Sequence, residues 1–145
     1  MKAINEMHLR FQSKSSNESF ARVAVSSFIS SLDPTIDEIS EIKTAVSEAV
    51  TNCIVHGYRN TLGTVYINVR IYENGKIIMV IKDKGCGIED VETAMQPLYT
   101  SDNSGERAGM GFTIMQSFMN KFRVRTRTGK GTTVILEKTL TLKTK

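Results

Sequence analysis

The sequence predicts an α+β domain: a two-layer sandwich in which helices cover one face of a mixed sheet of about five strands. Three observations indicate this class. The 145 residues, 40% of them hydrophobic, suit one domain with a single core. The apolar segments switch between the alternation typical of strands and the spacing typical of helices. The predicted strands are not continuously apolar, so we expect one sheet face to stay uncovered.

The first part of the chain is expected to contain one strand and two helices. Residues 7–12 alternate apolar and polar side chains, which predicts a half-buried strand. Asn17 offers an N-terminal cap to a helix whose apolar residues recur at helical spacing. Pro34 ends that helix and begins a second one, which we expect to run to about His56, with Gly57 as its end signal.

The rest of the chain is expected to add four strands and two helices. Asn74-Gly75 separates two runs rich in β-branched residues and is a strong signal for a hairpin turn. The polar stretch 100–107 predicts a mobile loop, and residues 139–145 predict a loose tail of a single domain spanning 1–145. The expected elements are strands at 64–72 and 76–82, helices at 90–95 and 109–122, and strands at 123–127 and 132–137.

Composition argues against several classes of function. No apolar run approaches the roughly 18 residues of a membrane span, so we expect a cytoplasmic protein with no membrane association. Cys53 and Cys86 lack CxxC spacing and are interpreted as free thiols. The net charge of +4 gathers in the last segment without interleaved aromatic residues, so we expect no direct nucleic-acid binding. Neither His8 nor His56 stands in a metal-binding pattern.

One polar stripe on the second predicted helix carries candidate chemistry. Because a helix advances about 100° per residue, Glu48, Asn52 and His56 fall within about 80° of one another, opposite the apolar face. By periodicity alone, an ordinary solvated face is the simpler interpretation of this stripe. His56, next to Gly57, is interpreted as a helix-end residue that bonds terminal carbonyl groups.

Two glycine loops favour a binding site over that simpler interpretation. Asp83 ends a predicted strand and is followed by Gly85 and Gly87, whereas Gly109 and Gly111 open a predicted helix. Glycines permit close backbone approach, and the free N–H groups at a helix N-terminus suit phosphates. Taken singly, each loop fits a plain turn as well as a site.

In their order and spacing, these motifs resemble the GHKL family of ATPases and kinases. The resemblance rests on Glu48-xxx-Asn52-xxx-His56-Gly57, then Asp83-x-Gly85-x-Gly87, then Gly109-x-Gly111, and it covers most of the chain. The stretches 47–52 and 96–115 resemble in particular the anti-sigma factor kinases within that family. The resemblance implies the Bergerat-type ATP-binding fold of the GHKL family, with ATP and Mg²⁺ as cofactors.

The resemblance also implies roles for individual residues. Asn52 matches the family's ligand of the Mg²⁺ that bridges the nucleotide phosphates. Glu48 matches the general base that accepts a proton from an attacking hydroxyl group. Asp83 is expected to receive the adenine amino group, with Gly87 giving the base room and Thr132 assisting Asp83.

The second glycine motif departs from the family pattern. A further glycine often stands two residues before the position of Gly109, and this chain has Arg107 there. Arg107 is therefore either a catalytic residue that reaches the terminal phosphate or an ordinary solvated side chain. The other residues expected to contact the nucleotide are Gly85, Thr100, Ser101, Ala108, Gly109, Met110, Gly111 and Phe112.

The function implied by the resemblance is that of an anti-sigma factor and serine protein kinase. Such a protein binds Mg-ATP, sequesters a sporulation sigma factor of RNA polymerase, and transfers the terminal phosphate of ATP to a serine of an anti-anti-sigma partner. Similar proteins form homodimers, and an exposed sheet edge would serve self-association. Two alternatives remain: an ATP-binding regulator without catalysis, and a histidine-kinase-like ATPase module.

Overall fold

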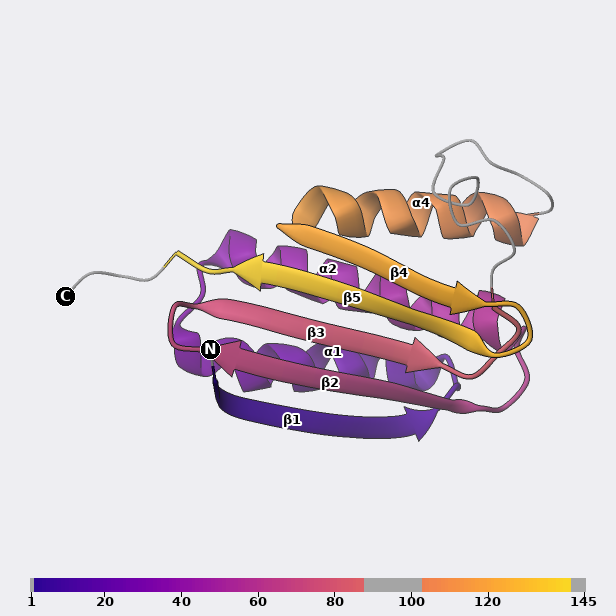
Figure 1. The fold of residues 1–145 in the computed structure, drawn as a ribbon, viewed down its shortest axis with the longest axis horizontal. Coiled ribbons are helices and arrows are strands. Elements are labelled where there is room, and N and C mark those ends of the chain that lie inside the picture. Colours follow the sequence, from indigo (N-terminus) through magenta and orange to yellow (C-terminus); the bar gives the residue numbers. More distant parts are fainter. Residues whose placement is uncertain (1, 88–102, 142–145) are drawn as a thin grey trace.

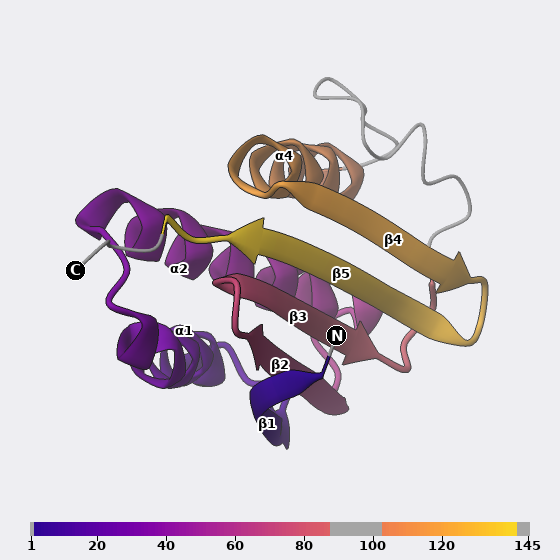
Figure 2. The ribbon, with the colours of Figure 1, turned by 60° about the vertical axis from the view of Figure 1, so that its left-hand side comes forward.

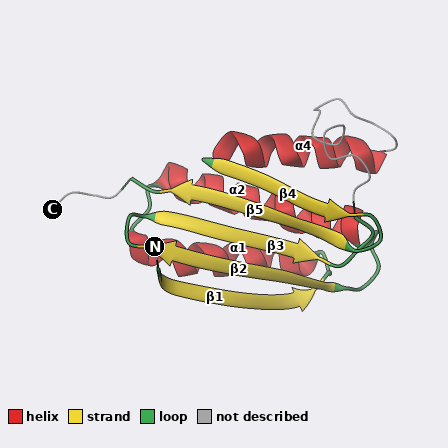
Figure 3. Cartoon of the chain, in the orientation of Figure 1, coloured by secondary structure: helices red, strands yellow, loops and turns green. Residues whose placement is uncertain are grey.

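The computed structural model describes residues 2–87 and 103–141, with the backbone alone described at 103–109. Within these residues, five strands and three α-helices form two layers (Figures 1 and 3). In chain order the elements are β1 (Ala3–Gln12), α1 (Ser16–Ile29), α2 (Ile36–Asn52), β2 (Thr64–Tyr72), β3 (Lys76–Asp83), α4 (Asn103–Phe118), β4 (Lys121–Arg127) and β5 (Gly131–Thr139).

The strands form one sheet in the order β1-β2-β3-β5-β4, with β1 and β4 at its edges. The α+β class and the five strands are confirmed, but the expected mixed pairing is wrong, because every described pair is antiparallel. The reason lies in the last hairpin. β4 runs in the same direction as β3, but β5 returns by a tight turn and fills the place between them, so the two like-directed strands never pair.

All three helices cover one face of the sheet, as the sequence predicts. α2 packs between α1 and α4 behind the strands, and the opposite sheet face is open to solvent (Figures 1 and 2). Burial alternates along the strands, so the covered face supplies the core and the open face stays half-exposed. The largest fully buried side chains of the core are Val25, Ile29, Ile42, Val46, Ile67, Ile71, Ile77, Met79, Ile81, Phe112, Met115 and Leu136.

Helix starts differ from the sequence-based expectations. Asn17 does not cap α1, because its Nδ2 donates to the carbonyl oxygen of Gln12 and the helix begins one residue earlier. Thr35 caps α2 through a reciprocal pair of hydrogen bonds with Glu38, a capping box that our sequence analysis did not use. Burial opposes ionisation of Glu38, but hydrogen bonds from Thr35 and Thr141 leave its pKa lowered.

The bounds of the last helix are shifted. α4 already begins at Asn103, so part of the polar stretch expected as a loop is helical, and Gly109 and Gly111 lie inside the helix rather than at its start. The short helix expected at 90–95 lies outside the described residues. Among the described residues, no helix is both long enough and apolar enough to cross a bilayer.

The second helix changes its winding where a simple end was expected. After Asn52, the chain makes a π-helical turn over Cys53–Gly57, and Tyr58 N–H closes it on the carbonyl of Cys53. The π-turn inserts an extra residue into the helical period, and such turns often lie at functional sites.

Candidate functional site

Four segment ends meet at one end of the molecule. They are the end of β3, the start of β5, the π-turn after α2 and the first turns of α4 (Figure 1). Hydrogen bonds tie three of these segments together: Cys86 N–H, in the loop after β3, donates to the carbonyl of Gly57 at 2.9 Å, and Gly129 N–H, in the turn before β5, donates to that of Cys86 at 2.7 Å. The sequence-predicted site residues from the second helix and the first glycine loop are therefore neighbours in space.

Asp83 is a buried carboxylate at the centre of this end. It is only 3% exposed, although it closes a strand that leads into a loop. Gly85 N–H donates to its Oδ1 at 2.9 Å, and the Cys53 thiol and the Thr132 backbone N–H also donate to the carboxylate. Burial raises the pKa of Asp83, and these three donors offset part of that rise.

Glycines surround Asp83 because no larger residue would fit. A β-carbon on Gly57 would lie 2.7 Å from Asp83 Cγ, and one on Gly131 would lie 2.2 Å from the Asp83 carbonyl oxygen. A β-carbon on Gly85 would lie 2.1 Å from the carbonyl oxygen of Gly57. The backbone therefore packs closely around Asp83, and Gly57 borders its carboxylate directly.

Asn52 is the most unusual polar residue of the helix. It is 9% exposed, and within the described part of the chain neither its Nδ2 nor its Oδ1 has a hydrogen-bond partner. A buried amide left without partners costs roughly 1–3 kcal/mol, so folding alone does not explain it. A neutral amide oxygen is a suitable ligand for a hard cation such as Mg²⁺. The unpartnered amide therefore fits the expected metal ligand.

The middle of α4, at Gly111, lies over Asn52 and Glu48. A β-carbon on Gly111 would lie 3.0 Å from Glu48 Oε2 and 3.4 Å from both amide atoms of Asn52. Glu48 is half-buried one helical turn before Asn52. The structure thus brings Gly111 of the second glycine motif next to the Glu48 carboxylate and the unpartnered Asn52 amide, although the glycine lies far from both residues in the sequence.

Three further residues that were expected to contact the nucleotide are described by the structure: Gly87, Phe112 and Met110. Gly87 has φ +76° and faces the carbonyl oxygen of Arg127, so the approach of the β4–β5 turn already requires a glycine there. Phe112 is buried and packs on Phe122 with ring centroids 5.8 Å apart, so its side chain belongs to the core. Met110 is 52% exposed.

The remaining expected contacts are not described in full. Thr100 and Ser101 lie outside the described residues, and Arg107, Ala108 and Gly109 are described as helix backbone alone. Thr132 pairs with Asp83 across β3 and β5, and its Oγ1 lies 3.0 Å from that of Thr126. In the described ranges no group of three or more His, Cys, Asp or Glu side chains forms a metal site.

Three residues touch Asp83 without having been predicted from the sequence to do so. Gly57 is expected there only as a helix-end signal, and no contact with Asp83 is expected for Cys53 or Gly131. Burial and the neighbouring Asp83 raise the pKa of the Cys53 thiol well above its usual value, which keeps it a proton donor. Gly57 and Gly131 approach Asp83 only in the packed fold. No local pattern in the sequence therefore predicts that contact.

Comparison with known proteins defines the class. Residues 11–138 match the histidine kinase-like ATPase domain family, and the chain therefore belongs to that family of nucleotide-using domains. The chain is similar to curated proteins named anti-sigma F factor. That of Priestia megaterium is 56% identical over 138 residues, 94% of each chain, and that of Caldanaerobacter subterraneus is 58% identical over 134 residues, 92% and 93% of the two chains. The resemblance to anti-sigma factor kinases is confirmed.

Solved structures confirm the fold. The RsbU and RsbW domains of Rv1364c from Mycobacterium tuberculosis superpose with a TM-score of 0.69 at 17% identity, over 94% of this chain and 32% of that one. The histidine kinase domain of the blue-light activated histidine kinase from Erythrobacter litoralis gives a TM-score of 0.55 at 20% identity, over 85% and 60%. The chain thus spans about a third and somewhat over half of these two proteins, and the likeness concerns the fold alone.

Proposed function

We propose that this chain is an Mg-ATP-dependent serine protein kinase that also acts as an anti-sigma factor. It would sequester a sporulation sigma factor and transfer the terminal phosphate of ATP to a serine of an anti-anti-sigma partner. The names of its relatives support the sigma factor as a partner, and the kinase-like ATPase family supports phosphoryl transfer. One cytoplasmic domain over residues 1–145 would carry both activities.

The observation that carries this proposal is the unpartnered amide of Asn52 beside Glu48 and beneath Gly111. The Asn52 Oδ1 would hold Mg²⁺. When bound, the cation would neutralise charge on the nucleotide phosphates. Because Glu48 lies one helical turn before Asn52 on α2, its carboxylate would then lie near the phosphates.

Glu48 would act on the partner's serine. Its carboxylate would accept the hydroxyl proton as the serine oxygen forms a bond to the terminal phosphorus and the bond to the ADP oxygen breaks. Arg107 would stabilise the charge on the transferred group. Asp83, held by its three donors, would accept a hydrogen bond from the adenine amino group. Thr132 would support Asp83, with which it pairs across the strands.

Nucleotide contacts beyond these come from both glycine motifs. Gly85 and Gly87 would border the adenine. The part of α4 around Gly111 would meet the phosphates, because it lies next to Glu48 and Asn52. The residues proposed there are Thr100, Ser101, Arg107, Ala108, Gly109, Met110, Gly111 and Phe112, the last through its backbone.

We also propose a homodimer that uses the β1 edge. Among the described strands β1 pairs on one side only, so its outer backbone groups are open to another strand. Exposed apolar side chains lie on β1 and on the neighbouring α1: Ile4 is 54% exposed, Phe20 50% and Val23 57%. A second copy would cover this apolar surface and pair with the open β1 edge.

The test uses ATP labelled at the terminal phosphate, Mg²⁺ and the candidate partner protein. We expect acid-stable label on the partner, transfer reduced at least about 100-fold by Glu48→Gln with nucleotide affinity retained, and nucleotide affinity lost in Asn52→Ala. Asp37→Asn is the matched control, since it makes the same chemical change in the exposed first turn of α2. Acid-labile label would indicate a histidine kinase module, and ATP binding without transfer would indicate a non-catalytic regulator.

A further inference from the structure

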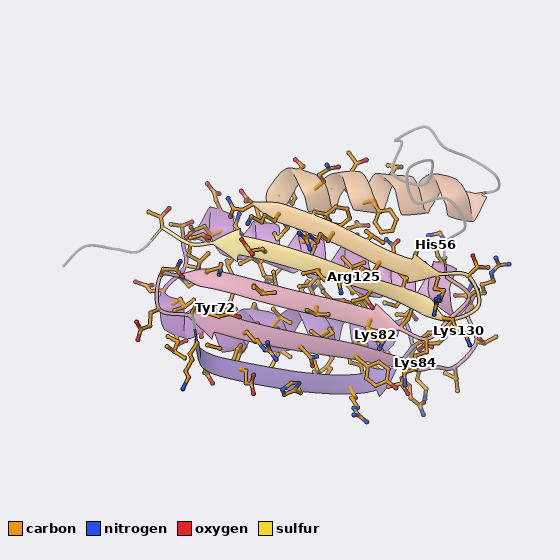
Figure 4. The ribbon with its side chains drawn as sticks, in the orientation of Figure 1. His56, Tyr72, Lys82, Lys84, Arg125 and Lys130 are labelled. Atoms are coloured by element: carbon orange, nitrogen blue, oxygen red, sulfur yellow. The ribbon has the colours of Figure 1, made fainter. Side chains whose placement is uncertain are left out.

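The two ends of the open face of the sheet differ in charge. At the end near Asp83, one cross-strand row contains Arg10, Tyr66, Lys82, Thr133 and Arg125, in that order across all five strands. We call this set the cationic row. It presents three cations and no carboxylate, and Figure 4 shows Lys82 and Arg125 at this end of the open face.

The opposite end of the same face is neutralised. The corresponding row there contains Glu6, Arg70, Ile78, Glu137 and Lys121. Arg70 Nε lies 3.3 Å from Glu6 Oε2, and Lys121 Nζ lies 3.9 Å from Glu137 Oε2. In the described part of the chain, no carboxylate pairs with Arg10, Lys82 or Arg125, so the cationic row keeps its charge for an external partner.

Tyr66 organises the cations at one end of the row. Arg10 Cζ lies 5.3 Å from the centroid of its ring, and Lys84 Nζ lies 5.2 Å from it. Attraction to the ring favours holding the two cations beside each other. They border a hollow of about 360 Å³ whose lining is His8, Leu9, Arg10, Tyr66, Asn68, Lys82 and Lys84. The lining includes no acidic side chain.

We propose that the cationic row is a docking surface for an acidic, extended segment of a partner protein. Four inter-strand spacings of about 4.8 Å make the row about 19 Å long, which an extended segment of about six residues spans. Carboxylates on such a segment complement Arg10, Lys82 and Arg125. Nucleic acid fits less well, because cations already flank the ring of Tyr66, the row's aromatic residue, and a base would need that ring for stacking.

This surface goes beyond the proposed kinase reaction. Tyr66 and Lys82 point away from the core, because their neighbours Val65, Ile67 and Ile81 are buried beneath the sheet. The Asp83 carboxylate is buried on the helical side. A segment bound at the cationic row would therefore leave the nucleotide site open, and the two kinds of binding are separable by experiment.

The test measures binding of a fluorescein-labelled peptide of alternating Glu and Ser, about twelve residues long, by anisotropy. We expect wild type to bind it in a salt-dependent manner, and Lys82→Glu/Arg125→Glu to weaken binding at least about tenfold. The matched control, Lys76→Glu/Lys121→Glu, makes the same net charge change at the far end of the same two strands and should weaken binding less than about threefold. Nucleotide affinity should be unchanged in both variants, whether or not the kinase proposal holds.

Three results would overturn the proposal. They are equal losses in the two double variants, no binding by wild type, and tighter binding of an oligothymidylate of similar length than of the peptide. Thermal unfolding of each variant verifies folding. If charge reversal unfolds the protein, Lys82→Gln/Arg125→Gln replaces it, and this variant must still bind the peptide more weakly than the control.

Discussion

Gly57 faces the carboxylate of Asp83 so closely that a single added methyl group would lie 2.7 Å from its Cγ. The glycine ends the π-turn that follows α2, and the aspartate ends β3. The contact fixes the distance between the helix that carries Asn52 and the strand that carries Asp83. It therefore sets the width of the proposed nucleotide site.

Gly57→Ala tests this relationship. The added methyl group must push Asp83 or the π-turn aside, so we expect a loss of about 1–3 kcal/mol in the free energy of unfolding and a clear loss of nucleotide affinity. Gly129→Ala is the control: it has φ +78° with nothing within 4 Å of an added β-carbon, so it costs about 1 kcal/mol through backbone strain alone. Denaturant unfolding and nucleotide titration measure both. Unchanged nucleotide affinity in Gly57→Ala would contradict the assigned role of this contact.

Asp83 should give the protein a measurable pH dependence. Burial raises its pKa in the folded state above that of the unfolded chain, so the folded state binds the proton more tightly. Its stabilising contribution is therefore complete below the unfolded pKa of about 3.9 and is lost as the pH rises through the folded pKa. The unfolding free energy of wild type relative to Asp83→Asn should fall over that range. A difference that stays constant or rises with pH would show that the three donors outweigh burial.

The two thiols should react at very different rates. Cys53 is buried, and burial together with Asp83 raises its pKa, so little thiolate forms. Cys86 is half-buried in the glycine loop. We expect one fast-reacting thiol in the native protein with a disulfide reagent, two after denaturation, and none fast in Cys86→Ser. Nucleotide should slow the fast reaction, and a fast thiol remaining in Cys86→Ser would contradict this assignment.

Lys138 joins three elements behind the sheet. Its Nζ donates to Glu41 Oε2 at 2.7 Å and to the carbonyl oxygen of Phe118 at 2.9 Å, which connects β5 with α2 and the end of α4. Lys138→Met removes both donors, so we expect a loss of about 1–3 kcal/mol in the free energy of unfolding. Glu41→Gln keeps an acceptor and the Phe118 contact, and it should cost less. Equal losses in the two variants would assign the effect to charge rather than to the connection.

The sequence predicts the local parts of the fold well because their signals are local. Alternation around Asn74-Gly75 predicts β2 and β3 almost to the residue, since turn and strands lie in one short segment. The pairing of β5 with β3 joins residues from Asp83 and Thr132 to Lys76 and Thr139, 49 to 63 positions apart, and nothing in either strand specifies it. The prediction of a mixed sheet is wrong because this pairing could not be predicted.

The features of the site also fall into those that a local sequence pattern predicts and those that it does not. The spacing of Glu48 and Asn52 predicts a shared helix face, and the structure adds that Gly111 lies over it. The sequence predicts only that Cys53 is a free thiol, and the structure adds that this thiol donates to Asp83. That contact depends on the π-turn and on sheet packing, which no window of sequence reveals.

The place of β5 also has a consequence for synthesis on the ribosome. The last strand of the chain lies inside the sheet, between β3 and β4. Until it emerges, β3 has an open edge, Asp83 lacks its donor from Thr132, and β4 has no described strand partner. We infer that the end of the sheet around Asp83 takes its final form only after β5 has been synthesised.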